Sequence, residues 1–69
     1  MDEDEEREKQ EWVAEVRVTT SNYWRVVDEM DPDTVDACHV RIARKQSPYL
    51  GSNIEYRIRN VRTGVIIEV

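Results

Sequence analysis

Apolar and polar residues alternate in two parts of this chain, and a single helical pattern separates these parts. Alternation with a period of two is typical of strands that bury one face. A polar link, Thr20-Ser21-Asn22, divides the first part, and a tight turn at Arg62-Thr63-Gly64 divides the second. The pattern therefore predicts two β-hairpins, with strands at residues 12–19, 23–30, 54–61 and 65–69.

The helical pattern begins at Asp31-Pro32-Asp33-Thr34. Asp31 offers a capping carboxylate, and Pro32 is favoured at the first helical position because its missing N–H has no partner there. The helix should extend to about residue 46, since the residue before Pro48 is excluded from helical geometry. At about 100° per residue, the apolar stripe facing the sheet should consist of Val35, Cys38 and Ile42.

These elements predict an α+β fold of two layers in the order ββαββ, with one helix packed on a four-stranded, mainly antiparallel sheet. Residues 12–69 should form this single domain. The order of the strands is left open by the pattern. On the second strand, Trp24, Val26 and Met30 should face the helix, which leaves Tyr23, Arg25 and Val27 on the opposite side of the sheet. That opposite side is called the outer face.

The N-terminal segment, residues 1–11, carries the whole net charge of the chain. It holds seven acids and two bases, which equals the net charge of -5, and residues 12–69 balance at eight acids against eight bases. A block of like charges cannot bury enough surface to offset its ordering entropy. We therefore expect an acidic disordered tail, or a frayed helix, that is either solubilising or steers a partner through Glu3, Asp4, Glu5, Glu6 and Glu8.

The chain lacks the sequence features of a secreted or membrane protein. Cys38 is the only cysteine, and the Met-Asp-Glu-Asp start has neither the basic nor the apolar region of a secretory signal. No apolar run approaches the roughly 20 residues that span a bilayer. We expect a cytoplasmic protein.

Metal binding and catalysis find little support in the residue pattern. Cys38 and His39 are neighbours on the predicted helix and point about 100° apart, so they cannot share one zinc ion or act as nucleophile and base. Asp31-x-Asp33-x-x-Asp36 begins like a calcium loop but lacks the glycine and the closing glutamate of such a loop, and helix capping explains its acids. We expect no catalytic residue, no metal site, no cofactor and no enzyme activity.

The outer face combines arginine, tyrosine and aliphatic side chains, a composition that is enriched at protein interfaces. Arginine outnumbers lysine eight to two, which favours specific pairing over loose solvation. An unpaired sheet edge offers a second docking route, by addition of a partner strand. The residues expected to bind a partner protein are Arg17, Tyr23, Arg25, Arg57, Arg59 and Ile66.

Three other interpretations explain the same residues. Single-stranded nucleic acid could bind the arginines and stack on Tyr23, although the outer face also carries acids. Cross-strand pairs between arginine and glutamate would account for the arginines without any ligand. A domain of this size with no disulfide has a small core, so it could also be stabilised as a homodimer whose sheets pair by face or by edge.

The segment Tyr56-Arg57-Ile58-Arg59-Asn60-Val61-Arg62-Thr63-Gly64-Val65-Ile66 resembles the closing hairpin of small tailed-phage proteins, in which an Arg-Asn-x-x-Thr-Gly turn follows an aromatic strand. The size and α+β build are also similar to those of small phage inhibitors of the host RNA polymerase. The resemblance implies a phage protein that binds and modulates a host protein, such as the transcription machinery. We therefore predict a non-enzymatic protein–protein interaction module, with single-stranded nucleic-acid binding and a homodimeric structural protein as the alternatives.

Overall fold

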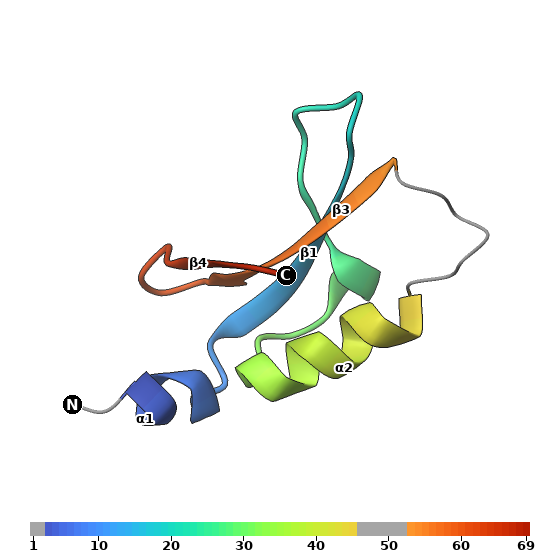
Figure 1. Cartoon of the computed structure of the whole chain (residues 1–69). Helices are drawn as coiled ribbons and strands as arrows, with labels where there is room; N and C mark the ends of the chain where they lie inside the picture. Colours follow the sequence, from blue (N-terminus) through green and yellow to red (C-terminus); the bar gives the residue numbers. More distant parts are fainter. Residues whose placement is uncertain (1–2, 46–52) are drawn as a thin grey trace.

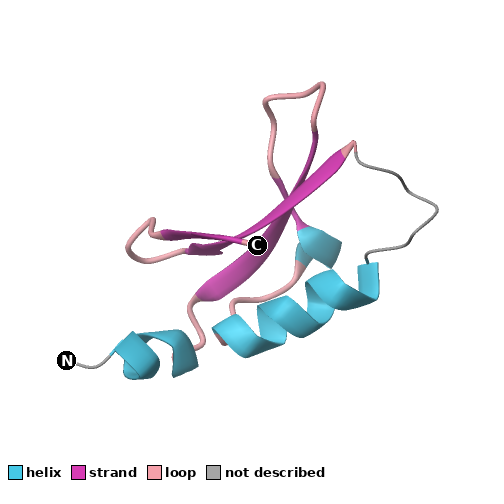
Figure 2. Cartoon of the chain, viewed as in Figure 1, coloured by secondary structure: helices cyan, strands magenta, loops and turns pink. Residues whose placement is uncertain are grey.

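The computed structural model describes residues 3–45 and 53–69. Along the chain the elements are α1 (Glu3–Glu8), β1 (Trp12–Val18), β2 (Arg25–Val26), the 3-10 helix η1 (Val27–Glu29), α2 (Val35–Lys45), β3 (Ile54–Asn60) and β4 (Ile66–Glu68). The long helix α2 lies along one face of the strands (Figure 1), and helix and sheet form two layers (Figure 2). The predicted α+β fold, one helix on a four-stranded antiparallel sheet, is confirmed.

The strands lie in the order β2-β1-β3-β4, and every neighbouring pair is antiparallel. The central strands β1 and β3 pair along their whole length, from Trp12 opposite Asn60 to Val18 opposite Ile54. Because β1 belongs to the first hairpin and β3 to the second, this pairing joins the two hairpins into one sheet. It also leaves the shortest strands, β2 and β4, at the two edges.

The second strand is much shorter than the expected residues 23–30. β2 has only two residues, and η1 follows it directly. Asp28 and Glu29 have φ angles of 54° and 51°, in the left-handed region that no strand includes. Lys45 Nζ lies 2.8 Å from Asp28 Oδ1 and holds this bend against α2. The bend carries Val27 into the core, which corrects its predicted place on the outer face.

The helix α2 begins three residues later than the predicted first helical position. The Thr34 side chain accepts a hydrogen bond from the Ala37 N–H at 3.2 Å, so Thr34 is the capping residue in place of Asp31. Asp33 cannot be helical, because its backbone exchanges hydrogen bonds of 2.9 and 2.7 Å with the backbone of Trp12. The predicted end of the helix near residue 46 and Pro48 falls outside the described residues.

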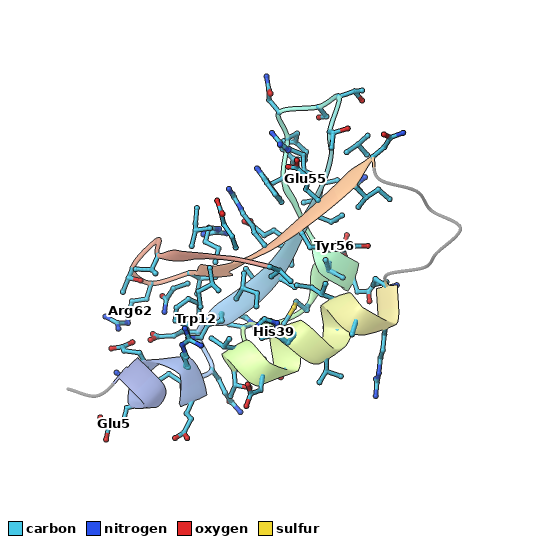
Figure 3. The ribbon with its side chains drawn as sticks, in the orientation of Figure 1. Glu5, Trp12, His39, Glu55, Tyr56 and Arg62 are labelled. Carbon is cyan, nitrogen blue, oxygen red and sulfur yellow. The ribbon has the colours of Figure 1, made fainter. Side chains whose placement is uncertain are left out.

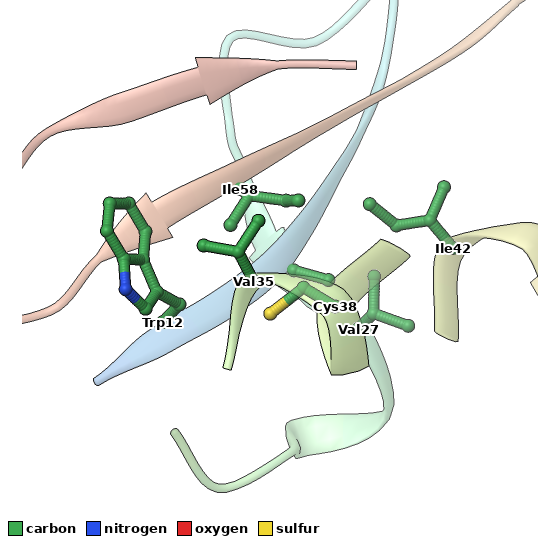
Figure 4. Close-up of a cluster of buried hydrophobic side chains, with 7 residues drawn as sticks. Trp12, Val27, Val35, Cys38, Ile42 and Ile58 are labelled. Carbon is green, nitrogen blue, oxygen red and sulfur yellow. The ribbon is translucent and has the colours of Figure 1, made fainter. Parts of the chain in front are cut away.

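The core lies between α2 and the sheet, as Figure 4 shows. The predicted stripe on α2 is confirmed, because Val35, Cys38 and Ile42 are all buried there. Met30 packs against this cluster, and its Sδ accepts a hydrogen bond from the Ala14 N–H at 3.3 Å. Within residues 3–45 and 53–69, this buried cluster consists of Trp12, Ala14, Val27, Val35, Cys38, Ile42 and Ile58.

The N-terminal segment forms the helix α1 over residues 3–8, which differs from the expected disordered tail and matches the helical alternative more closely. The reason is tertiary. The Trp12 indole N–H donates a hydrogen bond of 2.8 Å to the Glu6 carbonyl oxygen, and Arg62 Nη2 lies 3.4 Å from Glu6 Oε2. These contacts give the acidic segment a buried partner six positions along the chain and an opposite charge 56 positions away.

Candidate functional site

The outer face of the sheet is organised around one buried carboxylate. Glu15 on β1 is only 4% exposed, and it lies opposite Arg57 in the β1–β3 ladder. Its Oε1 accepts a hydrogen bond from Arg57 Nε at 2.7 Å, and its Oε2 accepts one from Arg59 Nε at 3.1 Å. Two of the arginines predicted to bind a partner therefore neutralise a carboxylate of the protein itself.

Arg17 is engaged in a similar way. Its guanidinium forms an ion pair with Glu55, which faces it across the ladder. It also lies over the Trp24 ring, with its Cζ atom 5.0 Å from the ring centroid, and Arg57 Cζ lies 4.1 Å from the same centroid. Both distances are within the range of cation–π attraction. Ion pairs with glutamates thus engage Arg17, Arg57 and Arg59 without a ligand, while the buried Arg17 Nε has no hydrogen-bond partner among the described residues.

The faces of the second strand are the reverse of those predicted. In the β1–β2 register Arg25 lies opposite Val16, whose side chain packs on the core side, and Val26 lies opposite Glu15. Arg25 is therefore exposed on the helix side of the sheet, which corrects its predicted place on the outer face. Trp24 occupies the outer face instead, and sequence reasoning had assigned it to the core.

Tyr23 precedes β2 and lies outside any strand. Its side chain is 71% exposed, the highest value among the large apolar side chains of residues 3–45 and 53–69. Its own N–H donates to the Ser21 hydroxyl at 3.1 Å, as part of the turn that joins β1 to β2. Tyr23 is therefore accessible to a partner.

The Arg-Asn-x-x-Thr-Gly segment makes the turn between β3 and β4. The Asn60 side-chain oxygen accepts hydrogen bonds from the Arg62 N–H at 2.8 Å and the Thr63 N–H at 2.9 Å, and Asn60 is 1% exposed. Gly64 has a φ of 80°, the conformation that favours glycine. The residues that carry the phage resemblance thus have a structural role in this hairpin.

Figure 3 shows that Arg62 of this turn and Trp12 of β1 both lie beside α1. Arg62 Nε and Nη2 donate to the two carboxylate oxygens of Glu11 at 2.6 and 3.2 Å. The hydrogen bond to Arg62 is the main reason why the pKa of Glu11 is lowered to about 2. Among the residues of the predicted steering arm, Glu6 faces Arg62, Glu5 and Glu8 are exposed, and Glu3 and Asp4 belong to α1.

The backbone of β4 leaves one edge free. The Asn60 N–H donates a hydrogen bond of 2.8 Å to the Val65 carbonyl, so Asn60 and Val65 are a bonded pair. Facing pairs in an antiparallel ladder alternate between bonded and non-bonded, which makes Ile58 and Ile67 the next bonded pair. Ile67 therefore turns its N–H and C=O toward β3, whereas Ile66 and Glu68 turn theirs outward. Within the described ranges, no further strand pairs with that outer edge.

Exposed aliphatic side chains gather on the same hairpin. Ile66, predicted to bind a partner, is 46% exposed on the outer face opposite Arg59. Seven large apolar residues are exposed in the described part of the chain, and four of them lie in the last nine residues. These four are Val61, Val65, Ile66 and Val69.

Cys38 and His39 do not form a reactive pair. Cys38 is fully buried, and this burial raises the pKa of its thiol to about 11. His39 is exposed on α2. No group of three or more potential metal ligands occurs in residues 3–45 and 53–69.

The comparisons with known proteins add no relative. No family model, curated protein or solved structure matches the chain. In the part that the structure describes, no helix has the length and apolarity needed to cross a bilayer.

Proposed function

We propose that this chain is a non-enzymatic protein-binding module that adds a strand of a partner protein to the outer edge of β4. The observation that carries the proposal is the outward direction of the Ile66 and Glu68 backbone groups on an edge that no described strand covers. An extended segment of another protein can pair with such an edge, because main-chain hydrogen bonds supply affinity whatever the partner's sequence.

The side chains around this edge suit a protein partner. Ile66 projects from the outer face of β4, and Val65 and Val69 lie on the helix face at its two ends, all about half exposed. A partner strand would cover apolar surface on both faces of the sheet, which is the main favourable contribution to association. Glu68 is the only charged side chain of β4, so the partner strand need not be highly charged.

The arginines of the outer face support this edge rather than forming it. Arg59 and Arg57 lie opposite Ile66 and Glu68 in the β3–β4 ladder, and both are held by Glu15 on the next strand. A guanidinium that already binds a carboxylate has less to gain from a phosphate. This pairing is why we favour a protein partner over single-stranded nucleic acid.

The acidic helix α1 contributes to the same function as a steering element. The side chains of Glu5 and Glu8 are exposed, and exposed charge of one sign raises the rate at which an oppositely charged partner is encountered. We expect association with a basic partner to slow as salt is added. In line with the hairpin resemblance, we propose that the partner is a bacterial host protein.

The experiment is an affinity capture from nuclease-treated bacterial lysate with tagged wild-type protein, Glu68→Pro and Glu68→Gln, read by quantitative mass spectrometry. Proline at residue 68 removes an outward N–H and leaves the β3–β4 hydrogen bonds intact. Glutamine keeps that N–H and removes only the charge. We expect one nuclease-resistant protein to bind wild type and Glu68→Gln, and to fall by about tenfold or more with Glu68→Pro.

Two results would overturn this proposal: equal capture of that protein by Glu68→Pro, or a requirement for nucleic acid. Thermal unfolding of Glu68→Pro shows whether the variant is folded. A second measurement avoids substitution altogether. Hydrogen exchange at the Ile66 and Glu68 amides of the wild type should slow when the captured protein is added, since both amides become hydrogen-bonded donors.

A further inference from the structure

The segment Val65-Ile66-Ile67-Glu68-Val69 has a valine at each end and Ile67 at its centre. An antiparallel strand pair reverses the direction of one strand, so this segment can pair with a second copy of itself about a two-fold axis. With Ile67 at the centre, each valine at one end faces the valine at the other end of the second copy. The two isoleucines at the centre face each other.

The backbone permits this register. The N–H and C=O groups of Ile66 and Glu68 point away from β3. A two-fold axis at Ile67 places Ile66 of one copy opposite Glu68 of the other, so outward groups meet outward groups and form bonded pairs. A shift of one residue would instead set outward groups against groups that β3 already uses.

The two other registers that the backbone allows are less favourable. A shift toward the C-terminus places Glu68 opposite Glu68 of the second copy, and like charges facing each other are destabilising. A shift toward the N-terminus places Glu68 opposite Gly64 in the turn and leaves Val69 without a partner. Only the register centred on Ile67 pairs all five residues of the segment.

Among the described residues, α2 does not pack beneath β4 as it does beneath β1 and β3. Val65 and Val69 on the helix face of the edge are 53% and 56% exposed. In the centred register these valines pack against each other across the two-fold axis, beside the two Ile67 side chains. On the outer face, Arg57 of the same copy lies on one side of Glu68. On its other side lies Ile66 of the second copy, followed by Arg59 of that copy.

We propose that, in the free protein, the β4 edge receives β4 of a second copy, which gives a two-fold symmetric dimer with one continuous sheet. This inference rests on the proposed function, because it concerns the same edge: the second copy occupies the edge in the free protein, and the host protein competes with it there. A five-residue strand pair is a small interface, below about 1,200 Å². The dimer should therefore be weak and concentration-dependent.

The first experiment is sedimentation equilibrium of the wild type, Glu68→Pro and Glu68→Gln over a wide concentration range. We expect the wild type to approach twice its 8.2 kDa mass at high concentration. Glu68→Gln should do the same, whereas Glu68→Pro should remain monomeric. A wild type that stays monomeric throughout, or a dimer that Glu68→Pro does not weaken, would overturn the proposal.

The second experiment tests the register by disulfide trapping. In the centred register the two Ile67 residues form a non-bonded pair with Cα atoms about 4.5 Å apart, within the span of about 4.4–6.8 Å that a disulfide bridges. Ile67→Cys should therefore cross-link under mild oxidation. Ile66→Cys should not, because its counterpart is displaced by two residues along the strand, beyond about 7 Å.

Wild type, whose Cys38 is fully buried, is the control for oxidation. Preferential cross-linking of Ile66→Cys would contradict the centred register. These measurements distinguish an error in the dimer proposal from an error in the proposed function. A monomeric wild type whose capture of a lysate protein is still abolished by Glu68→Pro would overturn the dimer alone.

Discussion

At the scale of single residues, Glu15 has the most demanding environment on the outer face. Its carboxylate is removed from water and depends on Arg57 and Arg59 for its hydrogen bonds. Glu55, in contrast, is an exposed acid that pairs with Arg17 at the rim of the same face. A buried group that loses its partners costs far more than an exposed pair, because water cannot replace the lost bonds.

We predict that Glu15→Gln lowers the free energy of unfolding by about 1–3 kcal/mol, because two guanidinium groups lose a charged acceptor. The matched variant Glu55→Gln should change it by less than about 1 kcal/mol. Urea unfolding of both proteins, followed by circular dichroism, measures the difference. Equal effects of the two substitutions would show that burial does not set the strength of the Glu15 pairs.

Glu11 gives the protein a defined response to acid. Arg62 lowers the pKa of Glu11 from 4.5 to about 2 in the folded state. A carboxylate with a lowered pKa stabilises the fold when the pH is above its unfolded value, and this stabilisation is lost as the pH falls through the folded value. We therefore expect the thermal midpoint to fall between about pH 4.5 and pH 2.

In Glu11→Gln this part of the pH dependence should be absent, while the variant is less stable than wild type at pH 7. The two proteins should converge only below about pH 2, where Glu11 becomes protonated in both states of the wild type. Glu8→Gln, which changes an exposed acid of α1, is the control and should follow the wild-type curve. A Glu11→Gln curve parallel to that of wild type would contradict the assignment.

At the scale of secondary-structure elements, two residues, Asp31 and Thr34, are candidates to cap the start of α2. The sequence favours Asp31, but the structure uses Thr34, whose hydroxyl accepts from the Ala37 N–H. Asp31 is exposed and lies before the bridge between Asp33 and Trp12. The bridge keeps the chain extended up to Asp33, so the helix can only begin beyond it.

We predict that Thr34→Ala lowers the free energy of unfolding by about 1 kcal/mol, the typical cost of a lost helix cap. Asp31→Ala should leave it within about 0.5 kcal/mol of wild type, as expected for an exposed residue outside the cap. Chemical unfolding compares the two. A larger effect of Asp31→Ala would indicate that Asp31 caps the helix, as the sequence alone suggests.

At the scale of the whole molecule, the acidic segment belongs to the folded unit. The Trp12 indole is 3% exposed and bonds to the Glu6 carbonyl, while Arg62 connects the β3–β4 turn to Glu6 and Glu11. Helix α1 thereby contacts both the start of β1 and the β3–β4 turn. A tail that only improved solubility would make no such contacts with the folded domain.

We predict that deletion of residues 1–10 leaves a cooperatively folded domain whose stability is lower by about 1–3 kcal/mol, since a buried indole N–H loses its acceptor. The tryptophan emission should also shift to longer wavelength, because Trp12 becomes accessible to water. Trp24→Phe in both proteins removes the second tryptophan and assigns the shift to Trp12. Unchanged emission and stability would mean that α1 contributes nothing to the fold.

The sequence alone determined the fold class, the buried stripe on α2 and the turn at Gly64. These features depend on local patterns: a period of two, a spacing of about 100° per residue and a glycine where φ is positive. Local patterns survive in any tertiary arrangement, so they could be predicted with no knowledge of strand order.

Only the tertiary structure decided which residues meet. A shift of one residue in strand register moves each side chain to the other face, and this is why Trp24 and Arg25 exchanged the places expected for them. The pairing of Glu15 with Arg57 joins residues 42 positions apart, and that of Arg62 with Glu11 joins residues 51 apart. No local signal encodes such contacts, because they form only when β1 and β3 become neighbours in the sheet.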